Sequence, residues 1–367
     1  MINATMPSIL LLGPSLSAVS GVSTHINQLM GSSLAANYRL LHFQVGSEGR
    51  QEGKAHKIWR FMFSPFALAA KIISESPDIV HLNTSLEQKA FWRDAVYFMI
   101  AKICQKKVVY QVHGGDLPQQ FFKNNRFFSA ILRCVLSGSE AVVLLASVER
   151  DAYQQFACFK SLSIIANAID LDAYRDQTKR PMASELVHLG YIGRLAHNKG
   201  VFESIEAINL LHKSGDQQFT LTIAGSGPAE LDLREQVKAL GLDNVVCFSG
   251  ALFGQQKMAF WQQTDIFVFP TFHREGLPYT VLESLASGTP MVTTRVGGIS
   301  DVIKDGVHGI FVEPHDAAGV AAAIKRMTDD RIATQRMAAK CVARAREFYS
   351  VERLASQFND LYQSILS

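Results

Sequence analysis

The chain has 367 residues and a mass of 40.5 kDa, which predicts two or three domains of about 100–200 residues each. Hydrophobic residues make up 48% and charged residues 19% of the chain, a balance that excludes an intrinsically disordered protein. No apolar run reaches the roughly 18 residues of a membrane-spanning helix, and we expect no secretory signal. The five cysteines are scattered without a CxxC pair, so we expect a cytoplasmic protein without disulfides.

The net charge of +3 is unevenly distributed. Residues 1–180 carry 19 Lys and Arg against 13 Asp and Glu, whereas residues 181–367 carry 17 against 20. The basic half suits an anionic partner such as lipid headgroups, an acidic acceptor or nucleic acid. A chance distribution of surface charge explains the same numbers equally well.

In the first half of the chain, short apolar runs alternate with helical patterns. A helix is predicted at about Val22–Met30, behind the first of these runs. Continuous apolar strands separated by helices predict a parallel sheet that is covered on both faces. The predicted strands are Ser8–Gly13, Arg39–Val45, Asp78–Leu82, Lys107–Val112 and Ala141–Ala146.

The same alternation starts again near residue 186, which predicts a second doubly wound α/β domain. We expect one domain over residues 1–168 plus a C-terminal helix over 350–367, a linker over 169–184, and a second domain over 185–349. The last helix, Val351–Leu366, could pack across both domains, because its apolar residues have helical spacing. The predicted strands are Leu186–Ile192, Phe219–Ala224, Val245–Phe248, Ile266–Phe269, Met291–Thr294 and Gly309–Val312.

The segment Pro270–Gly298 has the most features of a ligand site. Ligands of parallel α/β sheets bind beyond the carboxyl ends of the strands, and this segment follows a predicted strand. Pro278 suits the first position of a helix, whose N–H groups over Leu277–Thr280 would form an anion site. Glu275 precedes this helix and Glu283 lies within it. Two glutamates beside a phosphate site suit the hydroxyls of a sugar or ribose; alternatively, Glu283 is solvated and Glu275 only compensates the helix dipole.

Three other loops follow predicted strands. Arg194 and Lys199 lie in the loop Gly190–Gly200, where two cations could neutralise a diphosphate. Gly21 opens the first helix and allows a close approach of phosphate, but this loop lacks the GxGxxG pattern of dinucleotide-binding proteins. His113 ends a predicted strand and could contact a substrate hydroxyl. Each of these residues could instead be an ordinary loop residue.

We predict no metal site. Asp170-Leu171-Asp172 matches the D-x-D pattern, but it lies in the predicted linker, where turn chemistry is the better interpretation. The eleven histidines show no HExxH spacing.

Two amphipathic stretches in the basic half mix aromatic and basic residues, namely Lys57–Ile73 and Phe121–Leu136. Such stretches either lie on a membrane surface or bury their aromatic residues in the core with a basic rim. We favour the core for the first stretch and the membrane for the second.

The residues from Glu275 to Glu283 form an E-x7-E motif. Together with GRLAHNKG at 193–200, AGSGP at 224–228 and CFSGAL at 247–252, they closely resemble the family 4 glycosyltransferases. These are retaining enzymes with the GT-B fold. The resemblance covers essentially the whole chain and is most specific in the C-terminal half. It implies two Rossmann-like, doubly wound parallel-sheet domains that face each other across a cleft.

The resemblance also implies roles for five side chains. Arg194 and Lys199 would bind the donor diphosphate and offset the charge of the leaving nucleotide. Glu283 would bind the ribose hydroxyls, and Glu275 would bind hydroxyls of the transferred sugar near the reacting face. His113 would contact the sugar and help to align the acceptor.

The remaining donor contacts come mainly from the backbone. Gly21 would let its loop close on the diphosphate, although the double glycine usual in the family is Ser20-Gly21 here. The base would lie near Ser249–Leu252. The reaction would be a front-face transfer with retention, in which the departing phosphate accepts the proton, and it would need neither a metal nor a cofactor. The other implied donor-binding residues are Gly193, Gly225, Leu252, Leu277, Pro278, Tyr279 and Thr280.

The expected substrates are a nucleotide-diphosphate sugar that donates a hexose-type sugar and a saccharide acceptor linked to a lipid, such as a polyprenyl diphosphate. The basic, aromatic-rich first domain is similar to those of enzymes that assemble lipopolysaccharide or exopolysaccharide. We therefore expect a peripheral protein on the inner face of the plasma membrane, with an anionic membrane surface and no nucleic acid among its partners. Two alternatives stay open, namely a nucleotide-sugar epimerase and a non-catalytic nucleotide-sugar-binding subunit.

Overall fold

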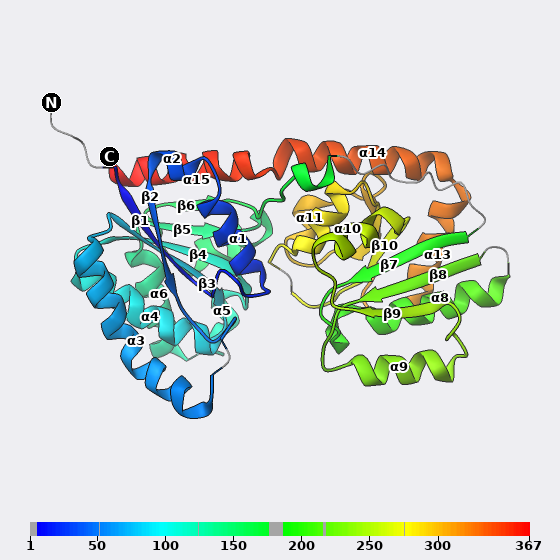
Figure 1. Cartoon of the computed structure of the whole chain (residues 1–367), viewed down its shortest axis with the longest axis horizontal. Helices are drawn as coiled ribbons and strands as arrows, with labels where there is room; N and C mark the ends of the chain where they lie inside the picture. Colours follow the sequence, from blue (N-terminus) through cyan, green and yellow to red (C-terminus); the bar gives the residue numbers. More distant parts are fainter. Residues whose placement is uncertain (1–5, 51, 124, 176–185, 216–217, 275) are drawn as a thin grey trace. The chain divides into compact units, whose positions relative to one another are not determined.

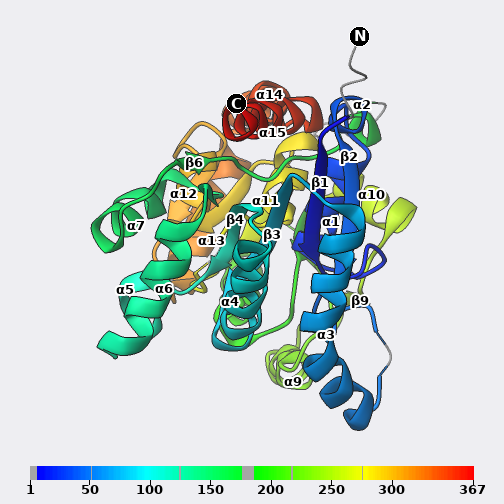
Figure 2. The same ribbon diagram turned by 90° about the vertical axis from the view of Figure 1, so that its left-hand side faces the viewer.

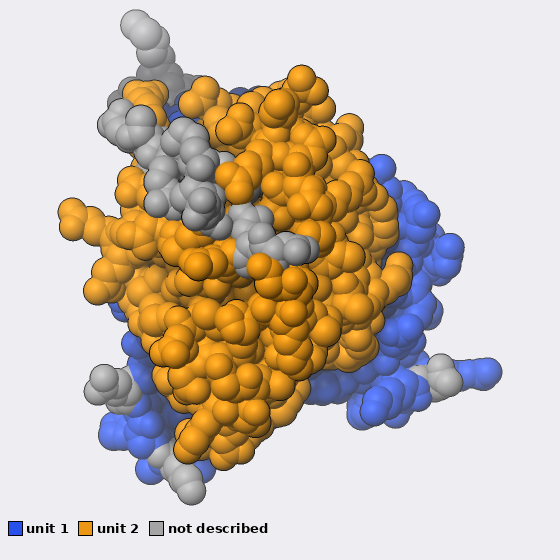
Figure 3. Space-filling view, turned by 90° about the vertical axis from the view of Figure 1, so that its right-hand side faces the viewer, with its two compact units in different colours: residues 1–168, 351–367 blue, residues 169–350 orange. Residues whose placement is uncertain are grey.

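The computed structural model describes residues 6–50, 52–123, 125–175, 186–215, 218–274 and 276–367. The chain forms two compact units, which Figure 3 colours separately. Unit 1 contains Met1–Ala168 and Val351–Ser367, and unit 2 contains Ile169–Ser350. Each unit is built on one six-stranded sheet (Figure 1).

The sheet of unit 1 is fully parallel and has the strand order β2-β1-β3-β4-β5-β6. Its central strands are apolar because both faces of the sheet are covered. In the register of the sheet, Leu11 of β1 lies beside His42 on one side and His81 on the other. The strands are β1 Ser8–Gly13, β2 Arg39–Gln44, β3 Ile79–Leu86, β4 Lys107–Gly115, β5 Ala141–Leu144 and β6 Leu162–Ile164.

Two layers of helices cover this sheet. Helices α3, α4, α6 and α7 pack on one face, and α1, α2 and α15 pack on the other, so that α3, α4 and α6 lie side by side in Figure 2. The helices are α1 Gly21–Met30, α2 Leu34–Asn37, α3 Lys54–Glu75, α4 Gln88–Ile103, α5 Pro118–Phe121, α6 Arg126–Gly138, the 3-10 helix η1 Ser147–Glu149, α7 Arg150–Phe156 and α15 Val351–Leu366.

The C-terminal helix α15 is part of the core of unit 1. Its buried side chains recur every three to four residues and include Leu354, Phe358 and Tyr362, so they form one stripe along the helix. Tyr362 also hydrogen-bonds through its hydroxyl to Nδ1 of His81 at 2.7 Å. The sequence left open whether this helix packs across both domains; the structure places it in unit 1.

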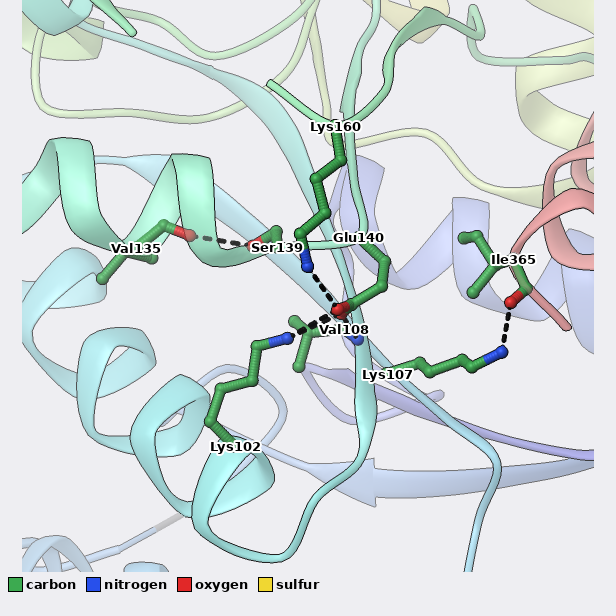
Figure 4. Close-up of polar contacts among 8 residues, drawn as sticks. All are labelled: Lys102, Lys107, Val108, Val135, Ser139, Glu140, Lys160 and Ile365. Atoms are coloured by element: carbon green, nitrogen blue, oxygen red, sulfur yellow. Dashed lines mark hydrogen bonds and ion pairs between the residues drawn. The ribbon is translucent and has the colours of Figure 1, made fainter. Parts of the chain in front are cut away.

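A charged residue between α6 and β5 connects four segments of unit 1. Glu140 accepts hydrogen bonds from Lys102 of α4 at 2.7 Å, from Lys160 at 2.9 Å and from the backbone N–H of Val108 at 2.6 Å (Figure 4). Burial acts to raise the pKa of Glu140, but these hydrogen bonds hold it below its ordinary value. In the same view, Lys107 donates to the carbonyl of Ile365 near the end of α15.

The sheet of unit 2 is also fully parallel and has the order β12-β11-β10-β7-β8-β9. All carboxyl ends of its strands therefore lie at one edge, where ligands of such sheets bind. The strands are β7 Leu186–Ile192, β8 Gln218–Ala224, β9 Val246–Gly250, β10 Ile266–Phe269, β11 Met291–Thr294 and β12 Gly309–Val312. The helices are η2 Asp172–Tyr174, η3 His197–Lys199, α8 Val201–Ser214, α9 Glu230–Ala239, α10 Gly254–Gln263, α11 Tyr279–Ala286, α12 Ile299–Val302, α13 Ala317–Asp329 and α14 Arg331–Phe348.

The predicted class of two doubly wound α/β domains is confirmed, and all eleven predicted strands are present. The short strand β6, Leu162–Ile164, was not predicted. Strands β3 and β4 continue past their predicted ends, so His113 lies within β4 rather than at its end. The cleft expected between the two domains stays a prediction.

The expectation that the aromatic residues of Lys57–Ile73 lie in the core is wrong. Helix α3 reaches the core through Leu68 and Ile72, whereas Trp59 and Phe66 are 62% and 70% exposed. The second stretch is divided, because its first two aromatic residues are buried and the next two are exposed.

Candidate functional site

The loops at the carboxyl edge of the unit 2 sheet are joined by backbone hydrogen bonds. The N–H of Gly193, directly after β7, donates to the carbonyl of Ala224 at the end of β8 at 3.0 Å. The N–H of Leu195 donates to Ser226 at 3.0 Å, and that of Gly225 donates to Gly250 at the end of β9 at 2.7 Å. The loops after β7 and β8 and the end of β9 therefore form one continuous backbone surface.

Gly225 is required for this close approach. Its φ is +141°, and a Cβ atom at this position would lie 1.9 Å from the carbonyl oxygen of Gly193. Any side chain would force these two loops apart. The two donor-binding glycines predicted in unit 2, Gly193 and Gly225, are thus in direct contact.

The loop after β7 carries the two predicted phosphate-binding cations. Arg194 is exposed, and its carbonyl accepts a hydrogen bond from the hydroxyl of Tyr191 at 3.0 Å. Lys199 ends the 3-10 helix η3 and is half-buried. Both cations are therefore held on one short loop, beside the backbone surface that Gly193 and Gly225 form.

The same loop is joined to the segment after β10. The carbonyl of Asn198 accepts hydrogen bonds from the N–H groups of Phe272 at 3.2 Å and His273 at 3.0 Å. Gly200 has a φ of +76°, and a Cβ atom there would lie 2.3 Å from the carbonyl oxygen of Pro270. The loop that carries Lys199 thus packs on the loop that leads to helix α11.

The start of α11 differs slightly from the prediction. Pro278 is extended, with φ −66° and ψ 133°, and it precedes the first helical residue, Tyr279. Leu277 is buried, whereas Thr280 is half-buried. The predicted catalytic residue Glu275 lies outside the described residues.

Glu283 of α11 is almost fully enclosed. Its side chain is 7% exposed. Lys257 of α10 binds one carboxylate oxygen at 2.6 Å, and the indole N–H of Trp261 donates to the other at 3.2 Å. The alternative interpretation of Glu283 as a solvated helix residue is therefore wrong.

Sequence reasoning missed Lys257 and Trp261. They are four residues apart and so lie on the same face of α10. The sequence did contain a signal for them, namely a cation and an indole at helical spacing shortly after the CFSGAL segment. Their partner, Glu283, comes from another helix, and a single sequence does not reveal that contact.

Two tyrosines lie close enough to Glu283 for its charge to affect their pKa. Burial and the charge of Glu283 raise the pKa of Tyr279 and of Tyr174. Both phenols are therefore neutral at physiological pH. Tyr279 is a predicted donor-binding residue, and Tyr174 adds a second phenol that sequence reasoning did not select.

Leu252, which is expected near the nucleotide base, lines a pocket of about 260 Å³. Ser249 and Thr222 line the same pocket, together with Gln256 and Phe260 of α10. The pocket therefore lies between helix α10 and the strands β7, β8 and β9, and the same helix carries the two partners of Glu283.

In unit 1, Gly21 is the exposed first residue of α1. Ser20 precedes it and caps the helix, because its hydroxyl accepts the N–H of Ser23 at 3.3 Å. A serine in place of the first glycine of the family pair is thus used for helix capping.

His113 belongs to a group of polar side chains in unit 1. Its Nε2 atom is 3.0 Å from Oδ1 of Asn83, and its ring centroid is 4.8 Å from that of His25. His25 in turn contacts Oε1 of Gln111 through Nε2 at 3.0 Å. Sequence reasoning selected His113 but missed its neighbours, which come from α1, β3 and β4.

Burial keeps these histidines neutral. It lowers the pKa of His25 to about 4 and that of His81 to about 3. The pKa of His113 is also lowered, first by burial and then by the two neighbouring histidines. His113 can therefore donate or accept a hydrogen bond at neutral pH, but it is not a cation there.

Within the part of the chain that the structure describes, no group of three or more His, Cys, Asp or Glu side chains could hold a metal ion. Asp170 accepts the backbone N–H of Asp172 at 3.1 Å, as expected for turn chemistry. Among the same residues, no helix has the length and apolar character needed to cross a membrane.

Residues 174–348 match the family model of the glycosyl transferases group 1. The glycogen synthase of Mycobacterium tuberculosis is 31% identical over 201 residues, which are 55% of this chain and 48% of that protein. The chain thus spans about half the length of the curated relatives it matches.

Two solved structures share the architecture of the whole chain. HepE from Anabaena in complex with UDP has a TM-score of 0.75 at 18% identity, covering 97% of this chain and 100% of that one. The apo form of the lipopolysaccharide outer core galactosyltransferase WaaB has a TM-score of 0.72 at 16% identity, covering 97% and 99%. These likenesses concern the fold. The family match covers nearly all of unit 2, so residues 174–348 are similar to the group 1 glycosyl transferases, and the chain has the GT-B class of fold.

Proposed function

We propose that the protein is a family 4 glycosyltransferase that transfers a hexose-type sugar from a nucleotide-diphosphate sugar to a saccharide acceptor with retention of configuration. One observation carries the proposal. The loop with Arg194 and Lys199 is joined by backbone hydrogen bonds to the Gly225 loop and to the segment that leads to α11. A diphosphate bound at this edge would have two cations and the start of a helix within reach.

The reaction would proceed at the front face of the donor sugar. The bond between the anomeric carbon and the diphosphate oxygen breaks, and the acceptor oxygen bonds to the same face of that carbon. The departing phosphate oxygen takes the proton of the acceptor hydroxyl. Arg194 and Lys199 would stabilise the negative charge that develops on the leaving group, so the proposal includes no metal and no cofactor.

The donor sugar and nucleoside would be held by the other residues of the site. Glu283 would bind the ribose hydroxyls through the lone pairs that Lys257 and Trp261 leave available, since a carboxylate has about four acceptor positions. Glu275 would bind hydroxyls of the transferred sugar. His113, as a neutral imidazole, would contact the sugar and the acceptor, and Gly21 would approach the diphosphate.

The proposed acceptor is a saccharide on a lipid carrier, such as a polyprenyl diphosphate, in the synthesis of a surface polysaccharide. WaaB, which shares the fold, is described as a lipopolysaccharide outer core galactosyltransferase, and HepE binds UDP. The basic character of residues 1–180 supports a place at the inner face of the plasma membrane.

Thermal-shift measurements with UDP-, GDP- and ADP-sugars test the donor site. A ligand that binds only the folded protein raises its melting temperature, so we expect one nucleotide class to do so. The Glu275→Ala variant should keep this shift and its fold but lose most of the turnover. A Lys238→Ala variant, changed at an exposed position of α9, is the matched control.

Product analysis then separates the proposal from its rivals. A transferase forms a glycoside only when an acceptor is added and keeps the anomeric configuration, in the presence of EDTA as well. A sugar interconverted without an acceptor would show an epimerase. Donor binding without hydrolysis or transfer would show a non-catalytic subunit.

A further inference from the structure

The large exposed apolar side chains of the protein are concentrated on three helices of unit 1. Of the twenty such side chains among the described residues, thirteen lie on α3, α4 and α6, whereas four lie in unit 2. Isolated apolar residues on a surface are normal, but a cluster of this size marks an interaction surface.

Helix α3 exposes most of its N-terminal half. From Ala55 to Phe63, only Arg60 is partly buried, and the N-terminal turns extend past the end of α4 in Figures 1 and 2. Trp59 and Phe63 pack on each other, with ring centroids 4.6 Å apart, and are 62% and 44% exposed. These turns have apolar side chains that nothing in unit 1 covers among the described residues.

Helix α4 continues this surface. Trp92, Val96, Met99 and Ile103 recur every three to four residues and form one stripe along the helix. They are 37% to 75% exposed, although the opposite side of the same helix already packs in the core. A helix that is apolar on all sides is normally buried on all sides.

Helix α6 completes the surface. Phe128 lies 5.1 Å from Trp92 between ring centroids, and its neighbour Phe127 is 70% exposed. Because α4 packs against both α3 and α6, the exposed apolar side chains of the three helices form one layer. We call this layer the apolar face. It consists of the exposed residues 58, 59, 61–63, 66, 73, 92, 96, 99, 103, 127 and 128.

The same three helices are strongly basic. They contain nine Lys and Arg residues and two acidic residues, Glu75 and Asp94, which gives a net charge of +7. Both acidic residues are paired, Asp94 with Arg93 at 2.7 Å and Glu75 with Arg39 at 2.8 Å. Two of the nine cations, Arg60 and Lys102, pair with Glu52 and Glu140 from outside the helices. The charge that remains around the apolar face is smaller but still positive.

We propose that the apolar face docks unit 1 on an anionic lipid bilayer, with the first turns of α3 in the headgroup region. Aromatic and aliphatic side chains with surrounding Lys and Arg are the combination that interfacial helices use. A second copy of the chain fits less well, because two such faces would bring equal positive charges together. This inference rests on the proposed function in one respect, since docking would bring the protein to a lipid-linked acceptor in the membrane. Binding to the bilayer itself needs neither donor nor acceptor.

Flotation of the full chain with vesicles tests this inference. We expect binding to vesicles that contain phosphatidylglycerol, little binding to pure phosphatidylcholine, and a clear loss of binding as salt screens the charges. The affinity of the double variant Trp59→Ser/Phe63→Ser for these vesicles should be at least about tenfold weaker, since two large apolar side chains are removed from the contact. The matched control is Leu231→Ser/Ile332→Ser, which changes two exposed apolar residues of unit 2.

Equal binding of the wild type and the Trp59/Phe63 variant, or binding that does not depend on anionic lipid, would overturn the inference. The inference would also be overturned if the wild type formed a concentration-dependent dimer and did not bind vesicles, and if the same double variant abolished that dimer. The nucleotide-sugar thermal shift is measured on each variant. A variant that keeps this shift while losing vesicle binding separates failure of docking from failure of the proposed donor site.

Discussion

At the residue scale, the contact between Lys257 and Glu283 links α10 to α11. Glu283 is almost fully enclosed, and its carboxylate is held in place by the 2.6 Å contact with Lys257 and the hydrogen bond from Trp261. We predict that Lys257→Met raises the KM for the nucleotide sugar about tenfold or more and lowers kcat less. The physical reason is that removing one partner of a buried ion pair leaves an uncompensated charge, which costs about 3–5 kcal/mol, and that the carboxylate loses its orientation.

Steady-state kinetics with the best donor measure this effect. Lys257→Arg keeps the charge and should recover much of the affinity, whereas Lys238→Met changes an exposed lysine and should have no effect. An unchanged KM in Lys257→Met would show that the contact has no role in donor binding.

The buried histidines of unit 1 predict an acid-sensitive fold. The folded-state pKa of His25 is about 4 and that of His81 is about 3, whereas an unfolded histidine titrates near 6.5. Between these values the unfolded chain binds more protons, so stability falls as the pH drops below about 6.5 and is fully present above it. At about pH 5, His25 alone should cost about 2 kcal/mol.

Urea unfolding at about pH 7.5 and about pH 5 checks this prediction. The free energy of unfolding should decrease in the wild type, and the decrease should be smaller in His25→Asn. Equal stability of the wild type at the two pH values would contradict the assignment of neutral, buried histidines.

At the element scale, the contact between the loops after β7 and β8 depends on Gly225. A Cβ atom there would lie 1.9 Å from the carbonyl oxygen of Gly193. We predict that Gly225→Ala abolishes the thermal shift by the nucleotide sugar and lowers the melting temperature. Gly241→Ala is the matched control, since Gly241 also has a positive φ but nothing lies within 4 Å of its Cβ position; a similar loss in both variants would indicate backbone strain alone.

Helix α15 should be essential for the stability of unit 1. Phe358 is fully buried in the core between the helix and the sheet. Phe358→Ala should lower the free energy of unfolding by about 3–5 kcal/mol, because it removes a large apolar side chain and leaves a cavity. Chemical denaturation measures this change, with the exposed Gln363→Ala as the control. A cost below about 1 kcal/mol, close to that of a surface substitution, would contradict the packing of this helix.

At the scale of the whole molecule, the two parallel sheets were predictable because their strands are apolar runs such as Leu186–Ile192, which turns and helices separate. The strand β6 has three residues and no such pattern, so it was missed. The contact of Lys257 with Glu283 joins two helices, and the periodicity of the sequence does not indicate such a contact, so it was not predicted. The exposure of Trp59 was predicted wrongly, because periodicity identifies an apolar helix but not whether its partner belongs to the same chain.

The division of the chain into units also affects how it is synthesised. Unit 2 is one continuous segment, Ile169–Ser350, whereas unit 1 needs both Met1–Ala168 and the last seventeen residues, Val351–Ser367. A chain still attached to the ribosome can complete unit 2, but one side of the first sheet stays without α15 until residues 351–367 have been synthesised. A stop codon before Val351 would therefore damage unit 1, most of which is made first.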